Sequence, residues 1–145
     1  MKKIAGLLVV AVVAVGAVVV LRPQWAESMA PGLWAGRHKR VVRERATEFV
    51  DYLGKNELDK CVEMTDPEYV RQNGVVAVKL GFGVFHLLAK AATLSQDDVQ
   101  LSEVRLSDDN QTAEIDISLR IGGQWQYQKP WHWVRVEDQW YHSPQ

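Results

Sequence analysis

The strongest constraint on the fold is a strict alternation of apolar and polar residues near the middle of the second half of the chain. From Glu114 to Ile121, every odd position is isoleucine or leucine and every even position is polar. Successive side chains of a strand point to opposite faces, so this period of two predicts an antiparallel sheet with one buried and one solvated face. Gly122-Gly123 follows and predicts a two-residue hairpin turn.

The stretch from Gln124 to Tyr141 holds four of the six tryptophans and contains Pro130. Proline cannot donate a ladder hydrogen bond, so it favours a β-bulge, which reverses the alternation and keeps an arginine out of the core. With a bulge, the inward set is Trp125, Tyr127, His132, Trp140 and His142, and the outward set is Trp131, Trp133, Arg135 and Tyr141. Without one, Trp131, Trp133 and Arg135 join the inward face.

The preceding part of the chain has the period of helices. Apolar residues at spacings of three and four predict a helix from Arg37 to Gly54, a second from Leu58 to Thr65, and a short one after Asp66-Pro67. Residues 75–94 are apolar almost all round, and we expect only the stripe of Lys79, Gly83, His86 and Lys90 to face water. The predicted class is α+β, with about three helices packed on a strongly curved antiparallel sheet.

An uncharged apolar run covers residues 4–21. A bilayer-spanning helix needs roughly 17–25 such residues, and the core of a cleaved signal peptide is about 7–15. We predict a transmembrane signal-anchor over residues 1–22, a linker over 23–36 and one domain over 37–145. Lys2 and Lys3 favour a cytoplasmic N terminus, whereas Arg22 and the basic cluster at residues 37–40 favour the opposite orientation. Because a very short N-terminal tail usually stays inside, we place the domain outside the inner (cytoplasmic) membrane, as a single-pass protein. Cleavage after residues 28–30 (SMA) is the alternative.

Charge and cysteine content exclude some classes of function. From Glu44 to the C terminus there are 17 acidic and 10 basic residues, a net charge of −7, which argues against a nucleic-acid partner. The single cysteine, Cys61, excludes an internal disulfide and a cysteine metal cluster. No metal site and no cofactor is predicted, because His86 stands between two lysines without a second ligand nearby in the helix.

Three stretches resemble the nuclear transport factor 2-like superfamily, in particular its small membrane-anchored bacterial members. They are residues 46–53 (ATEFVDYL), 54–60 (GKNELDK) and 133–141 (WVRVEDQWY). The resemblance implies a cone in which helices lean on a curved sheet and enclose a pocket, and dimerisation through the outer sheet face. It also implies either an isomerase, dehydratase or cyclase or a protein without chemistry. No residue here matches the acid–base pair of the enzymes position by position.

No motif specifies a reaction, so no catalytic residue is assigned and three hypotheses remain. The first is a membrane-tethered extracytoplasmic interaction module, which meets a second copy or an envelope protein through Arg120, Trp131, Trp133, Arg135 and Tyr141. The second is a protein that binds a small apolar ligand in a pocket of Phe82, Phe85, Trp125, Tyr127, His132 and Trp140. The third is an isomerase- or dehydratase-like enzyme, which requires a carboxylate or second histidine within reach of His132.

Overall fold

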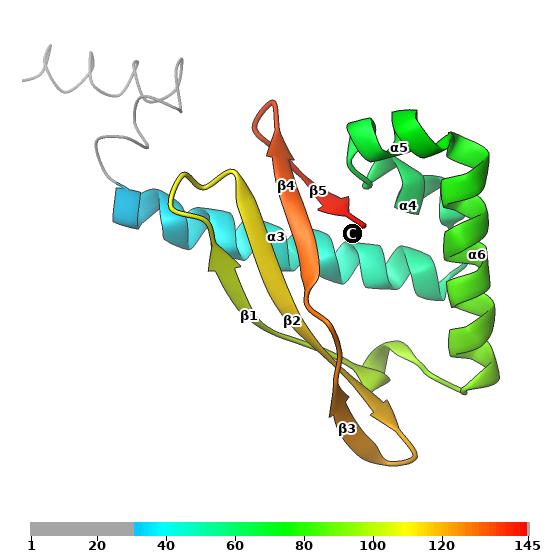
Figure 1. The fold of residues 1–145 in the computed structure, drawn as a ribbon. Helices are drawn as coiled ribbons and strands as arrows, with labels where there is room; N and C mark the ends of the chain where they lie inside the picture. Colours follow the sequence, from blue (N-terminus) through cyan, green and yellow to red (C-terminus); the bar gives the residue numbers. More distant parts are fainter. Residues whose placement is uncertain (1–30, 145) are drawn as a thin grey trace, which may run out of the picture. The chain divides into compact units, whose positions relative to one another are not determined.

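The computed structural model describes residues 31–144 and shows four helices followed by an antiparallel sheet (Figure 1). The predicted signal-anchor and most of the predicted linker lie outside the described residues. The elements are α3 (Pro31–Gly54), α4 (Leu58–Glu63), α5 (Pro67–Asn73), α6 (Val75–Ala91), the 3₁₀ turn η1 (Gln96–Asp98), β1 (Val99–Leu106), β2 (Thr112–Ile121), β3 (Gln124–Tyr127), β4 (Trp131–Val136) and β5 (Gln139–Ser143). The predicted α+β class, with helices packed on an antiparallel sheet, is confirmed.

The chain divides into two compact units, residues 1–37 and 38–145. The sheet, the helices α4 to α6 and most of α3 belong to the second unit. The first helix starts at Pro31, six residues before the start predicted from the apolar spacing. Within the described residues no individual helix has the length and apolar composition of a membrane span, although α5 and α6 together, bent by 102°, meet that criterion.

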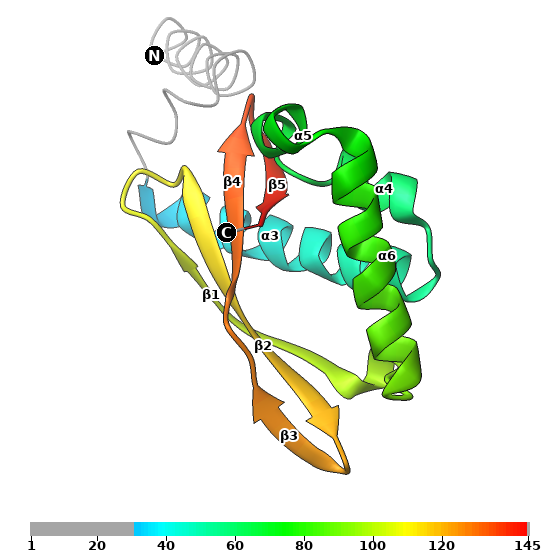
Figure 2. The ribbon, with the colours of Figure 1, turned by 45° about the vertical axis from the view of Figure 1, so that its right-hand side comes forward.

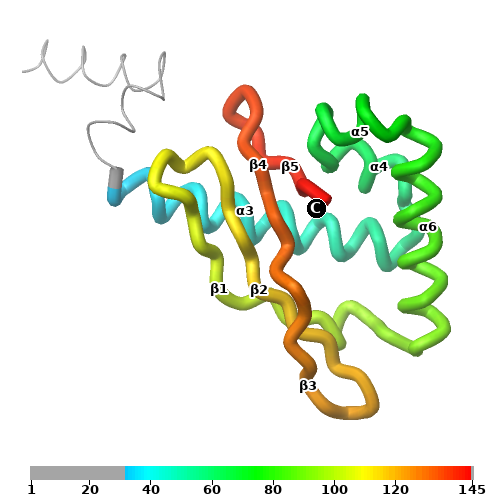
Figure 3. Tube along the Cα trace, in the orientation of Figure 1, coloured from blue at the N-terminus to red at the C-terminus, as the bar shows by residue number. Residues whose placement is uncertain are grey.

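The long strand β2 organises the sheet. β1 pairs with one edge of β2, and β4 and β3 pair with successive parts of the other edge, with β5 added outside β4 (Figures 1 and 3). Ser118 pairs with Tyr127 and Ile115 pairs with Trp131, so two residues of β2 oppose the three residues 128–130. This one-residue excess is the bulge predicted from Pro130, which is confirmed.

The predicted faces of the aromatic residues, however, were wrong. Ile121 pairs with Gln124 across the glycine turn, and directly opposed residues share a face. Gln124 and Gln126 therefore lie on the inner face, while Trp125 and Tyr127 lie on the outer face and are 48% and 64% exposed.

The bulge then reverses the alternation and turns the next aromatic residues inward. Trp133 is 1% exposed, Trp131 packs against the core, and Arg135 is also buried. Arg135 is tolerated there because its Nη2 donates to Asp138 Oδ1 at 2.6 Å in the β4–β5 turn, which satisfies part of the buried charge. The predicted outward patch of Trp131, Trp133 and Arg135 does not exist.

The core lies between α3 and the inner face of the sheet. Val42, Ala46, Phe49 and Leu53 line one side of α3, and the Phe49 ring meets Trp131 and Trp133 edge-on, with centroids 5.5 and 6.3 Å away. Every fully buried member of this core falls between Val42 and Trp140. A fragment of residues 31–145 therefore contains the whole core and is expected to fold on its own.

Helix α6 turns Val78 and Phe82 toward the rest of the domain as expected, but the side of the helix that faces water differs from the prediction. Its polar stripe faces the neighbouring helices, because Lys79 Nζ binds Asp59 Oδ1 at 2.7 Å and His86 Nδ1 lies 2.8 Å from the Leu53 carbonyl oxygen. The apolar side, formed by Val76, Leu80, Val84, Leu87 and Leu88, is between 57% and 72% exposed. Figure 2 shows α6 beside α4 and away from the sheet.

A candidate ligand pocket between the sheet and helix α6

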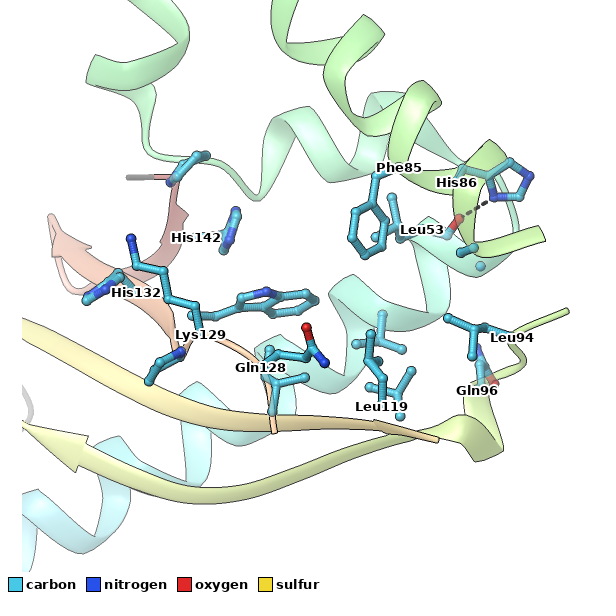
Figure 4. A pocket seen from close by; sticks show the side chains of 18 of the residues that line it. Leu53, Phe85, His86, Leu94, Gln96, Leu119, Gln128, Lys129, His132 and His142 are labelled. Carbon is cyan, nitrogen blue, oxygen red and sulfur yellow. Dashed lines mark hydrogen bonds between the residues drawn. The ribbon is translucent and has the colours of Figure 1, made fainter. Parts of the chain in front are cut away.

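An open cavity of about 1060 Å³ lies between the inner face of the sheet, the end of α3 and α6 (Figure 4). Its apolar lining comes from Leu53 of α3, Phe85 of α6, Leu94 after α6, and Leu119 and Trp131 of the sheet. Sites for small molecules commonly measure about 300–1,000 Å³ and have mostly apolar walls. A smaller adjoining cavity of about 410 Å³ shares Phe85, Trp131 and Leu53 with it.

The bulge between β3 and β4 forms one edge of the cavity. Gln128, Lys129 and Pro130 all line it, and Gln128 N still donates to the Ile117 carbonyl at 2.9 Å. A bulge bends its strand and redirects side chains. Pro130 therefore contributes to the pocket, because the extra residue brings Lys129 and Trp131 to it together.

Two backbone hydrogen bonds hold His142 of β5 in place. Its N–H donates to the Met64 carbonyl and its carbonyl accepts from Asp66 N–H, both at 2.8 Å, so the α4–α5 connection is joined to the strand. Asp66 also caps α5, as predicted, by accepting from Glu68 N–H at 3.0 Å. The His142 ring packs on Phe49, with centroids 4.7 Å apart, and borders the cavity.

The imidazole of His142 is neutral and lacks a polar contact at one nitrogen. It is 8% exposed, and burial, with a smaller effect of His132, lowers the pKa of His142 to about 4. Within residues 31–144, Nδ1 of His142 has no hydrogen-bond partner. A buried polar atom left unpaired costs about 1–3 kcal/mol.

His132 on β4 is among the residues that border the cavity, but it pairs with Glu114 on the polar face of β2 and therefore lies on the outer face, not inward as predicted. Its nearest carboxylate comes from this adjacent strand. Glu114 pairs with His132 across β2 and β4, and Glu114 Oε1 lies 3.5 Å from His132 Nδ1. An ordinary N–H···O hydrogen bond is about 2.7–3.2 Å, so the two groups form an ion pair at most. Within residues 31–144, no hydrogen bond joins His132 to a carboxylate.

Comparison with known proteins gives a match in structure only. No family model matches the sequence, and no curated protein matches it. A crystal structure from Campylobacter jejuni, of a protein assigned as an NTF2-like transpeptidase, superposes with a TM-score of 0.56 and 12% identity over 71% of this chain and 97% of that chain. The fold is nuclear transport factor 2-like. The predicted resemblance is thereby confirmed, and at this identity it concerns the fold alone.

In the nuclear transport factor 2-like fold, the predicted pocket residues lie in four different places. Phe85 and His132 line the main cavity, and Phe82 lines the smaller one. Trp125 and Tyr127 lie on the opposite face of the sheet, for the reason given by the hairpin pairing. Trp140 fills the core, where its Nε1 donates to His38 Nδ1 at 3.3 Å.

Several lining residues were not predicted as site residues. His142 was correctly expected to point inward, but its contact with a cavity depends on the space left by α6. Lys129 and Gln128 were not predicted as lining residues, because the bulge was used only to predict which face of the sheet each later side chain occupies. The signal was present in the sequence, since a bulge next to a polar pair often shapes a site.

The outer sheet face carries an aromatic patch built from other residues than predicted. Arg120 binds Asp98 Oδ1 through Nε at 2.8 Å and lies over the Trp125 ring, 5.6 Å from its centroid. Tyr127 donates its hydroxyl to Asp116 Oδ1 at 3.1 Å. Of the five predicted interface residues, Arg120 and Tyr141 remain on this face.

Arg105 and Asp116 form the most ordered ion pair of the same face. Nη1 and Nη2 of Arg105 each approach a different oxygen of Asp116 at 2.7 Å. This bidentate pair lowers the pKa of Asp116 and makes the carboxylate a fixed part of the sheet. Asp116 lies on the face of β2 predicted to be solvated, and it is engaged with both Arg105 and Tyr127. Within the described residues no three side chains are grouped so as to hold a metal ion.

Proposed function

We propose that the protein binds a small, largely apolar ligand in the cavity between the sheet and α6. The observation that carries this proposal is a space of about 1060 Å³ with a largely apolar lining that includes Phe85, Leu119 and Trp131. The apolar walls favour an apolar ligand. Binding without catalysis is the simpler role, since His132 and Glu114 lie 3.5 Å apart.

Filling the cavity tests this proposal. Ala89 lines the cavity, and Ala91, two residues further along α6, is exposed. We expect the fragment 31–145 to bind the uncharged dye N-phenyl-naphthylamine, with dye fluorescence as the readout. Ala89→Trp should abolish most of this signal, and Ala91→Trp should keep it. Equal binding by both variants contradicts the proposal, because the dye would then sit on the exposed side of α6.

Self-association through the outer sheet face is a second candidate function. It is favoured by the exposed Trp125 and Tyr127 beside Arg120, since aromatic residues with arginine are enriched at the centres of interfaces. Sedimentation equilibrium of the fragment 31–145 tests it. We expect a concentration-dependent dimer that Trp125→Ala converts to a monomer, and a wild-type monomer at all concentrations would exclude this candidate.

We also propose that residues 4–21 attach the protein to the cytoplasmic membrane, with the domain on the outer side. The length of this apolar run supports the attachment. Protease treatment of intact cells that express the full chain with a C-terminal tag tests it. Loss of the tag from intact cells is the expected result, and protection of the tag until the cells are opened would contradict it.

A further inference from the structure

The two cavities follow one another along the inner side of α6. The smaller one, of about 410 Å³, is lined by Ala77 and Gly81 from the first half of the helix, and the main one, of about 1060 Å³, by Ala89 and Lys90 from its end. Residues 77–90 span about 20 Å, at a rise of about 1.5 Å per residue. Among the residues of α6, all of which the structure describes, only Phe85 lines both cavities. Phe85 therefore stands at the junction of the two spaces.

The other side chains at this junction are held more firmly than Phe85. The residues that line both cavities, apart from Phe85, are Leu53, Tyr69, Trp131, His142 and Pro144. Each of these five is buried or half-buried, and the rings of Trp131 and His142 pack with centroids 5.4 Å apart. Phe85 is 43% exposed, and Figure 4 shows its ring directed from α6 into the main cavity. Phe85 is thus the part of the boundary that packing fixes least.

We propose that Phe85 limits the length of the ligand, which is a long unbranched apolar chain, and this rests on the proposed function of the cavity. Two spaces in a row along a helix suit an extended chain better than a compact ring system. The chain lies in the main cavity, and its end meets the Phe85 ring. Without this ring, a longer chain continues into the smaller cavity, whose apolar lining includes Val78 and Phe82.

Carboxylates of increasing chain length test the proposal, because they share one head group and differ only in the chain. Octanoate, decanoate, dodecanoate, tetradecanoate and hexadecanoate compete with the uncharged dye on the fragment 31–145, each below its micelle concentration. The dye affinity of each variant is measured first. Each methylene group that becomes buried should tighten binding about fourfold, and in the wild type we expect this gain to stop once the chain reaches Phe85.

Phe85→Ala should extend the range of chain lengths over which the affinity rises. Hexadecanoate should bind this variant at least about tenfold more tightly than the wild type, while octanoate should bind it no more tightly. A variant that had only lost contacts would bind every chain more weakly. Phe85→Leu, a smaller change, should extend the range to a lesser degree and gives the same test if Phe85→Ala does not fold.

Two further variants serve as controls. Leu88 lies on the outer side of α6 and is 65% exposed, so Leu88→Ala should keep the wild-type dependence on chain length. Gly81 lines the smaller cavity, and a Cβ placed there meets no atom within 4 Å. Adding Gly81→Leu to Phe85→Ala should therefore fill the smaller cavity and restore the wild-type limit. Circular dichroism melting verifies that each variant folds.

The outcomes separate this inference from the function on which it rests. If the gain stops at the same chain length in the wild type and in both Phe85 variants, the length limit is overturned while the apolar-ligand function stands. If the variant with both Gly81→Leu and Phe85→Ala still favours hexadecanoate, the longer chain does not enter the smaller cavity, which also overturns the inference. Failure of the dye and all five carboxylates to bind the wild type overturns the proposed function itself.

Discussion

Ile121 and Gln124 are paired across the Gly122-Gly123 turn, and this pairing decides which aromatic side chains face the cavity. It turns Trp125 and Tyr127 to the outer face of the sheet. The bulge at residues 128–130 then returns Trp131 and Trp133 to the inner face. A turn and a bulge together thus separate the tryptophan-rich end of the chain into an outer patch and an inner wall.

The two faces of the sheet predict very different losses of stability when a tryptophan is replaced by alanine. Trp133→Ala should destabilise the domain by about 3–5 kcal/mol, because it leaves a large cavity in the core. Trp125→Ala should cost at most about 1 kcal/mol, since its ring is 48% exposed and gains mainly from Arg120. Urea unfolding of the fragment 31–145 measures both. Similar costs for the two variants would contradict the assignment of faces.

The lowered pKa of His142 predicts an acid-sensitive fold. The unfolded chain binds a proton at His142 near pH 6.5, whereas the folded chain does so at about 4. The unfolded state therefore holds more protons between these values, so stability falls as the pH drops from about 6.5 to about 4. The loss amounts to ~3 kcal/mol and is absent above pH 6.5.

His142→Phe isolates this contribution, because it keeps an aromatic ring beside Phe49 and removes the titrating group. Urea unfolding across the same pH range should show a smaller slope for His142→Phe than for the wild type. Identical slopes would mean that His142 is not the group responsible.

The exposed side of α6 predicts tolerance to polar substitution. Leu80→Gln and Leu87→Gln should each change the free energy of unfolding by no more than about 0.5 kcal/mol, as at other surface sites. Val78→Ala on the buried side of the same helix should cost about 1–3 kcal/mol. Thermal melts of the three variants compare the two sides of the helix. A large loss of stability in both leucine variants would mean that this side of α6 is buried.

The sequence predicts local structure more reliably than it predicts which face of a strand or helix is buried. The β2 alternation, the glycine hairpin, the Pro130 bulge and the Asp66 cap are all local patterns, and each is present in the structure. The faces of Trp125 and Trp133 were wrong because alternation was carried through the turn, although residues 121 and 124 of a two-residue hairpin share a face. That rule alone would have corrected both assignments.

The orientation of α6 and the pocket depend on partners distant in sequence. The helix has both a polar and an apolar stripe, and periodicity alone does not show that Asp59 and the Leu53 carbonyl receive Lys79 and His86. The approach of Glu114 to His132 likewise requires the register between β2 and β4. The cavity follows from these long-range contacts. Of its predicted lining residues, only Phe85 and His132 were therefore found, while Phe82 lines the smaller cavity.

The most direct test of the central claim is a histidine NMR titration of the fragment 31–145 with dodecanoate. The chain has four histidines, which give a small set of imidazole signals that single substitutions assign. We expect the ring signals of His142 to shift strongly as the ligand occupies the cavity that this residue borders, while those of His38, held by Trp140 in the core, stay in place. Saturating dodecanoate that leaves the His142 signals unchanged would contradict ligand binding in this cavity.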